Sequence, residues 1–85
     1  MITGRQSRAA RALLGWTQET LADKALVSLT ALKRLESASE FRVYESTRDQ
    51  IRRVLESNGI VFLNSDQGEG VMAVRPKADR SLEDR

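Results

Sequence analysis

Cysteine and histidine are both absent from the 85 residues, proline occurs once, and aromatic side chains make up only 5% of the chain. Without cysteine there can be no disulfide, no thiolate metal site and no cysteine nucleophile. Without histidine the commonest general base and metal ligand is missing, and a Ser-His-Asp triad is excluded. We therefore expect no enzyme, no metal and no cofactor.

Long apolar runs are also missing, and the longest contain four residues, as in 60–63. A membrane-spanning helix needs about 20 apolar residues, and no apolar segment near Met1 suggests a secretory signal. Fourteen basic residues against twelve acidic ones give a net charge of +2, which fits a polyanionic partner only weakly. The length fits one small domain, so we expect a cytoplasmic binding module that has no contact with membranes.

Capping signals divide the first part of the chain into helices. Thr3 and Gln6 have the spacing of a capping box, and Gly15 stands where a helix C-cap glycine belongs, which predicts a helix over 4–14. Thr17 and Ser28 are N-cap candidates for two further short helices, over about 18–24 and 29–37. A fourth helix is expected from Ser46 or Thr47, as its cap, to a stop at 58–59. The apolar stripes predict the inward-facing residues, which are Ala9, Ala10, Leu13, Leu14, Leu21, Ala25, Leu32, Leu35, Ile51, Val54 and Leu55.

The pattern changes after residue 58. Residues 59–64 and 71–75 are two β-branched and apolar runs, separated by a turn-forming cluster and stopped by Pro76, which is typical of a β-hairpin. The charged residues 77–85 are expected to be a disordered tail. The predicted fold is mainly α: a four-helix repressor-like helix-turn-helix domain over 1–58, a β-hairpin over 59–76 and the tail over 77–85.

Residues 17–36 carry the functional signal, because two short helices separated by a tight break form a helix-turn-helix arrangement. The segment from Arg8 to Ala22 resembles the opening of phage-repressor-type (Xre/Cro-like) DNA-binding domains. Its Gln18-x-x-Leu21-Ala22 element between an arginine-rich first helix and a Val-Ser turn is fairly specific. Val27-Ser28, Leu32 and residues 34–36 agree with the same family. The last segments, 51–56 and 59–62, are similar to a small bacterial subgroup with a C-terminal strand pair, so the resemblance covers about residues 3–75.

The resemblance implies roles for individual residues in binding double-stranded DNA. Thr17, Gln18 and Ser28 would contact phosphates, and Gln18 would also reach the edge of a base. The groove-facing positions of the second short helix hold Leu29, Thr30, Lys33 and Arg34. Arg42, in the loop before the fourth helix, is a further candidate for a backbone contact. Arg11 and Glu36 would form a semi-buried ion pair that ties the first helix to the third.

Two leucines depart from the family pattern. Leu26 stands where the family usually has a glycine in the turn, and Leu29 is apolar at a position that usually contacts bases. Leucine can touch a thymine methyl group but makes no hydrogen bond. The primary hypothesis is a sequence-specific transcriptional regulator of bacterial or phage origin. The alternative is an antitoxin-like or antiactivator-like module that uses the degenerate helix-turn-helix to bind a protein partner.

The hairpin suggests a homodimer. Both strands are apolar at nearly every position, and an exposed edge can pair with another copy. We expect the dimer contacts at Ile60, Phe62, Val71 and Val74, an arrangement that allows the two hairpins to form one continuous sheet. The alternative is that the hairpin covers only its own helices. A two-fold dimer would place two recognition helices about one DNA turn, roughly 34 Å, apart and would predict an inverted-repeat operator.

Overall fold

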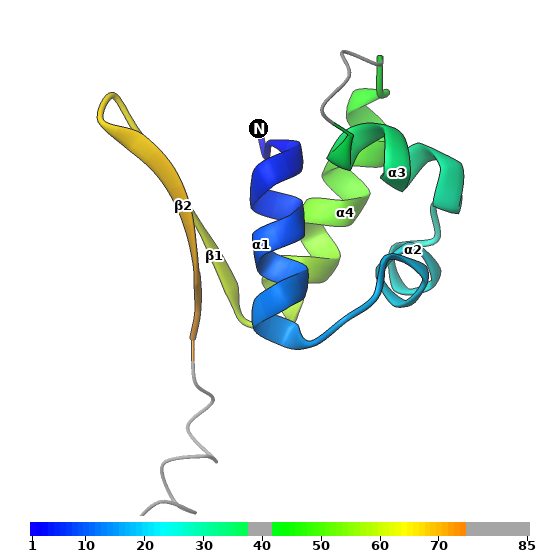
Figure 1. Cartoon of the computed structure of the whole chain (residues 1–85), viewed down its shortest axis with the longest axis horizontal. Helices are drawn as coiled ribbons and strands as arrows, with labels where there is room; N and C mark the ends of the chain where they lie inside the picture. Colours follow the sequence, from blue (N-terminus) through cyan, green and yellow to red (C-terminus); the bar gives the residue numbers. More distant parts are fainter. Residues whose placement is uncertain (38–41, 75–85) are drawn as a thin grey trace, which may run out of the picture.

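Four helices precede one β-hairpin in the computed structural model, which describes residues 1–37 and 42–74. The order and type of these elements confirm the fold predicted from the sequence. The predicted tail, 77–85, lies outside the described residues. Figure 1 shows the hairpin on one side of α1, with α2 and α3 on its other side. The elements are α1 (Gly4–Leu14), α2 (Gln18–Ala25), α3 (Leu29–Glu36), α4 (Glu45–Ser57), β1 (Ile60–Ser65) and β2 (Gly68–Ala73).

Side-chain caps start the first three helices, as their sequences predict. Thr3 and Gln6 form a complete capping box at α1, which ends at Gly15 in the left-handed conformation with φ 71°. The Thr17 hydroxyl accepts from the Thr20 amide at α2, and the Ser28 hydroxyl accepts from an amide in the first turn of α3. Each cap satisfies an amide that would otherwise lack a partner at a helix start.

The start of α4 differs from the prediction. The helix begins at Glu45, and its N-cap is Tyr44, whose side chain makes no capping hydrogen bond. Ser46 and Thr47, the two predicted caps, therefore lie within the first turn. The Arg48 amide bonds to the Tyr44 carbonyl, so the backbone closes the first turn earlier than a hydroxyl cap would place it. A glutamate in the first turn also suits the positive end of the helix dipole.

The core lies where α2, α3 and α4 meet. Leu21, Leu32, Ile51 and Leu55 are fully buried, one or two from each of these helices, as the apolar stripes predict. Trp16, by contrast, is only half-buried against this core. The stripe predicted for α1 is wrong at Ala9 and Leu13, which are exposed, because only one side of α1 faces the core. Within the described parts of the chain, no helix combines the length and the hydrophobicity that crossing a bilayer requires.

The hairpin has a regular antiparallel register, running from the pair Ile60 and Ala73 to the pair Ser65 and Gly68. Gln6 of α1 holds it in place, because its side-chain amide donates to the carbonyls of Leu63 and Gly70 at 3.2 and 3.0 Å. The buried Gln6 thus links the start of α1 to both strands at once.

Three of the four expected dimer contacts lie on the face that the hairpin turns toward its own helices. Ile60 is buried in the chain's own core, and Phe62 and Val71 pack against that core. Of the four expected contacts only Val74 is exposed. Successive side chains of a strand point to opposite faces of the sheet. The neighbours of the inward-facing residues in each strand therefore point outward. The large apolar side chains on the outward face are Val61, Leu63, Met72 and Val74.

Candidate nucleic-acid interface

A single buried carboxylate joins the first three helices. The Glu36 side chain, at the end of α3, is 1% exposed and forms an ion pair with Arg11 of α1 at 2.7 Å. It also accepts from the Ser7 hydroxyl at 2.6 Å and from the Gln18 amide of α2 at 3.1 Å. Arg8 donates to the Glu36 backbone carbonyl. These bonds fix the end of α3 against α1 and against the start of α2.

Close backbone packing adds to this arrangement. A Cβ atom at Gly4 would lie 2.1 Å from the carbonyl oxygen of Leu35, so only glycine lets α1 approach α3 so closely. Sequence reasoning singled out neither Gly4 nor Ser7. The glycine directly after the Thr3 cap could have indicated close packing at this point. The sequence gives no such indication for Ser7, because a serine within a helix is commonly exposed to solvent.

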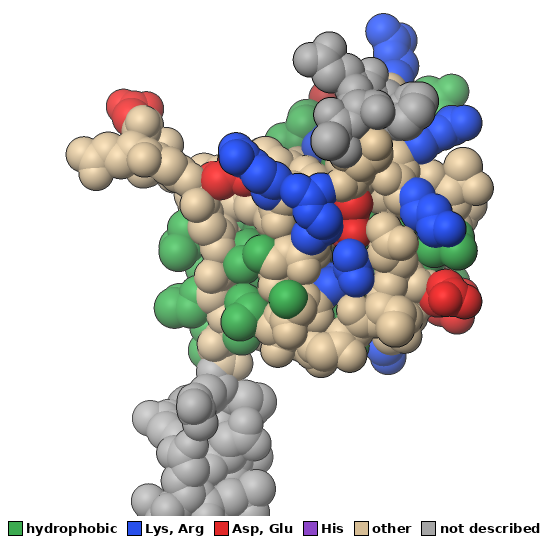
Figure 2. Space-filling model, in the orientation of Figure 1, with side chains coloured by type: hydrophobic (Ala, Val, Ile, Leu, Met, Phe, Trp, Pro, Cys, Tyr) green, Lys and Arg blue, Asp and Glu red, His purple; other side chains and the backbone are tan. Residues whose placement is uncertain are grey.

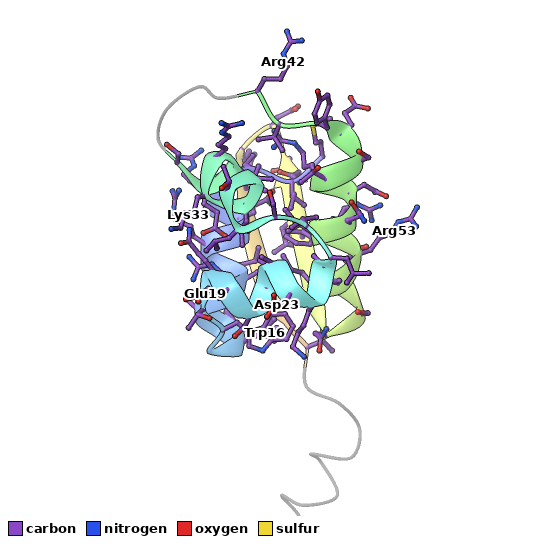
Figure 3. All side chains as sticks on the ribbon, turned by 90° about the vertical axis from the view of Figure 1, so that its right-hand side faces the viewer. Trp16, Glu19, Asp23, Lys33, Arg42 and Arg53 are labelled. Carbon is purple, nitrogen blue, oxygen red and sulfur yellow. The ribbon has the colours of Figure 1, made fainter. Side chains whose placement is uncertain are left out.

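The outer face of α3 presents three exposed polar side chains, those of Thr30, Lys33 and Arg34. In an α-helix, residues spaced by three and four share one face, so the three form a continuous strip. Figure 3 shows Lys33 on α3 and, higher in the view, Arg42 projecting from the segment that leads into α4. Arg42 is exposed as well.

Two shallow hollows border this strip. One, of about 410 Å³, lies between α2 and α3 and includes Gln18, Leu29 and Lys33 in its wall. The other, of about 300 Å³, lies between α3 and the start of α4, and Thr30, Arg34 and Arg42 line it. All eight residues that sequence reasoning assigned to DNA contact line one or the other hollow; the remaining two are Thr17 and Ser28.

Leu29 does not form an exposed apolar patch. Its side chain is half-buried and packs against the core, and Lys33 follows it one helical turn later in the same hollow. Of the two leucines that depart from the family pattern, Leu26 is the exposed one: it is 84% accessible and occupies the turn between α2 and α3. Leu26 adopts the left-handed conformation, with φ 57°, which explains why the family usually places glycine at this point.

The arginines of α4 are arranged differently. Arg52 pairs with Asp49 and Glu56, and Arg53 pairs with Asp49. The hydrogen bond from Arg52 lowers the pKa of Asp49 below its usual value, and the charge of Arg53 lowers it further. Two of the three arginines of α4 are therefore paired within the helix, and the third, Arg48, donates to the Ile2 carbonyl at 2.7 Å. Figure 2 shows other lysine and arginine side chains gathered on one face of the helical body.

The comparisons with known proteins agree with this geometry. Residues 8–42 match the family model described as helix-turn-helix, a family of DNA-binding domains and not of enzymes. The matched segment runs from α1 through α3 to Arg42, and the predicted resemblance to Xre/Cro-type domains is thereby confirmed. No curated protein and no solved structure is significantly similar to the chain. The chain thus carries a helix-turn-helix segment of the DNA-binding type.

Proposed function

We propose that this chain is a transcriptional regulator that reads a specific sequence of duplex DNA, as a homodimer on an inverted repeat. The observation that carries the proposal is the polar strip of α3, formed by Thr30, Lys33 and Arg34 and exposed at the surface. The DNA major groove is about 12 Å wide and admits one α-helix. With α3 in the groove, the starts of α2 and α3 face phosphates, which their free amides and dipoles attract.

Arg34 is the residue most suited to base recognition. A guanidinium can donate two parallel hydrogen bonds to O6 and N7 of guanine, which is the commonest specific contact. Lys33 is less selective, because its ammonium is a point charge that suits phosphates equally well. Thr30 is short enough to meet a phosphate or a thymine methyl group.

Gln18 has a part in both the fold and the proposed contact. Its amide nitrogen donates to Glu36 at 3.1 Å, but a side-chain amide has two N–H groups. The second N–H remains available to a phosphate while the first one holds the side chain in position. Glu36 therefore orients Gln18 before DNA arrives, so that less side-chain entropy is lost on binding.

A selection from random duplex DNA, followed by binding measurements at several salt concentrations, tests the proposal. We expect an inverted repeat whose affinity stays well above that for random DNA as salt rises. Weak, sequence-independent binding that disappears with salt would reflect charge attraction alone and would contradict the proposal.

Arg34→Ala and Arg53→Ala form a matched pair of variants, because each removes one positive charge from an exposed helical position. Arg34→Ala should weaken specific binding by about 1–3 kcal/mol and relax the preference at one base pair in each half-site. Arg53→Ala, on α4, should leave the preferred sequence unchanged. Equal effects of the two substitutions would mean that Arg34 contributes only charge.

One observation favours a second function, the binding of a protein. Leu26 is a large apolar side chain at the tip of the turn, and it is almost fully exposed. A protein partner could cover it, as expected of an antitoxin-like or antiactivator-like module. Retention of partner binding by a Lys33→Ala, Arg34→Ala double variant, together with its loss in Leu26→Ser, would support this second function.

A further inference from the structure

The outward face of the hairpin is apolar and carries no charge. Val61 and Met72 form one cross-strand pair on it, and Leu63 lies opposite Gly70. Val61 is 38% exposed, and Leu63, Met72 and Val74 are each 48% exposed. Figure 2 shows hydrophobic side chains along this part of the molecule. The inner face of the same hairpin already packs on the helices, so the outer face has no covering element among the described residues.

Gly70 is unexpected on this face. Glycine in the interior of a strand is unfavourable because it loses much conformational freedom on folding and offers no side chain for packing. Nothing among the residues that the structure describes requires a glycine here: Gly70 does not have a positive φ, and the strand pairing around it has no bulge. A Cβ atom there would meet only Leu63, at the ordinary distance of 3.9 Å.

A strand glycine without such a cause often marks the close approach of another molecule's backbone or of a ligand. Gly70 leaves a notch beside the Leu63 side chain, so the face has a projection and a depression next to each other. In a second copy related by a two-fold axis, the Leu63 side chain can enter the notch at Gly70 of the first copy, and the reverse contact forms at the same time. The face is therefore self-complementary. A face without charges also leaves no buried ion unpaired in such a contact.

We infer that Gly70, with Val61, Leu63 and Met72, forms the contact between two copies of this chain, hairpin face against hairpin face. The choice of a second copy as the occupant rests on the proposed function, which requires two helix-turn-helix units on one operator. The location suits that role, because α1 separates the hairpin from α2 and α3 (Figure 1). Two copies joined through their hairpins therefore leave both polar strips of α3 uncovered.

The size of the face determines how strong the contact is. Strands of six residues give a patch of about 20 by 10 Å, or about 200 Å², whereas stable complexes bury about 800 Å² on each partner. Free copies therefore associate weakly. On an inverted repeat the two half-sites hold the copies at a high effective concentration, so association appears chiefly as cooperative binding to DNA.

Sedimentation velocity over a concentration series, up to about millimolar chain, tests the contact without DNA. Wild type should associate as its concentration rises. Gly70→Val should lose this association while its thermal midpoint stays the same or rises, because valine suits a strand better than glycine. Association of Gly70→Val equal to that of wild type would overturn the inference, and is the result that edge-to-edge pairing of strands would give.

Met72→Lys and Asn64→Lys provide a second, matched comparison. Both place one positive charge on the hairpin, but Met72 lies on the outward face, whereas Asn64 pairs with Glu69, whose side chain bonds to α1. Met72→Lys should abolish association and Asn64→Lys should preserve it. Loss of association in both variants, or a wild type that stays monomeric throughout, would overturn the inference.

Binding to DNA separates this inference from the proposed function. Gly70→Val should bind a single half-site as wild type does and should lose cooperativity on the inverted repeat. Equal cooperativity in both proteins would refute the hairpin contact but leave the DNA-binding function intact. Absence of specific DNA binding, combined with the expected sedimentation results, would refute the proposed function and leave the hairpin contact standing.

Discussion

Removing Arg11 should destabilise the fold far more than removing any other arginine that has a described ion pair. Arg11→Met takes away the three hydrogen bonds that Glu36 receives from this guanidinium. The carboxylate is then left with Ser7 and Gln18 as partners, neither of which carries a charge. Truncating one member of a buried ion pair typically costs about 3–5 kcal/mol, because the other charge stays buried without compensation.

That loss is large for a chain of this size. At about 0.05–0.15 kcal/mol per residue, 85 residues correspond to about 4–13 kcal/mol of folding free energy. Each kilocalorie shifts the thermal midpoint of such a domain by about 4–8 °C. Thermal unfolding followed by circular dichroism should therefore show a fall of at least about 12 °C for Arg11→Met. Arg52→Met is the control, since its ion pairs are solvent-exposed, and it should change the midpoint little.

A double variant identifies the cause. If the unpaired buried charge accounts for the loss, Arg11→Met combined with Glu36→Leu should recover most of it, because neither charge remains. The Ser7 hydroxyl can then bond to a carbonyl of the preceding helical turn. A double variant less stable than Arg11→Met would refute the reasoning, as would a single variant that loses less than about 1 kcal/mol.

Three further perturbations follow from single contacts. Leu26→Gly should raise the free energy of unfolding in urea by about 1 kcal/mol, because a left-handed leucine is strained and its exposed side chain loses little burial; a decrease would contradict this. Gly4→Ala should lower it by about 1–3 kcal/mol through overpacking, although alanine favours helices, and an increase would show that α1 moves aside freely. The pKa of Glu69 is lowered from its ordinary value of 4.5 by the hydrogen bond from Thr3 and by Arg5. Its stabilising contribution is therefore present above pH 4.5 and lost as pH falls through the lowered pKa. Glu69→Gln should make the decline of the thermal midpoint on acidification shallower, and an unchanged decline would exclude this contact as a cause.

The helical part of the fold could be predicted because its signals are local. The hydroxyls of Thr3, Thr17 and Ser28 start three helices by accepting from backbone amides three residues further along the chain, and a glycine at position 15 ends the first. The start of α4 could not be predicted in this way, because its backbone closes the first turn from Tyr44 without a side-chain cap. Competing hydroxyls at positions 46 and 47 then pointed to the wrong residue.

Which face of the hairpin packs against the helices could not be predicted from the sequence, for a different reason. A strand shows its inner face through alternation of apolar and polar residues, and neither 60–63 nor 71–74 alternates. The deciding contacts are long-range: Gln6 donates to two strand carbonyls, and Glu69 bonds to Thr3 and Arg5. No pattern within the strands reveals partners more than 55 residues away in the chain.

The Arg11–Glu36 pair was expected because of the family resemblance, but the further hydrogen bonds from Ser7 and Gln18 to Glu36 were not. Glu36 is the last residue of α3, and its bonds reach α1 and α2 while its side chain stays buried. The residues that would read DNA, such as Arg34, lie on the opposite, exposed side of that helix. The residue that fixes the orientation of α3 and the residues proposed to read DNA therefore lie on separate faces of this helix. Substitutions on the exposed face should change which sequence is preferred at little cost in stability, whereas substitutions at Glu36 should reduce stability and binding to every sequence together.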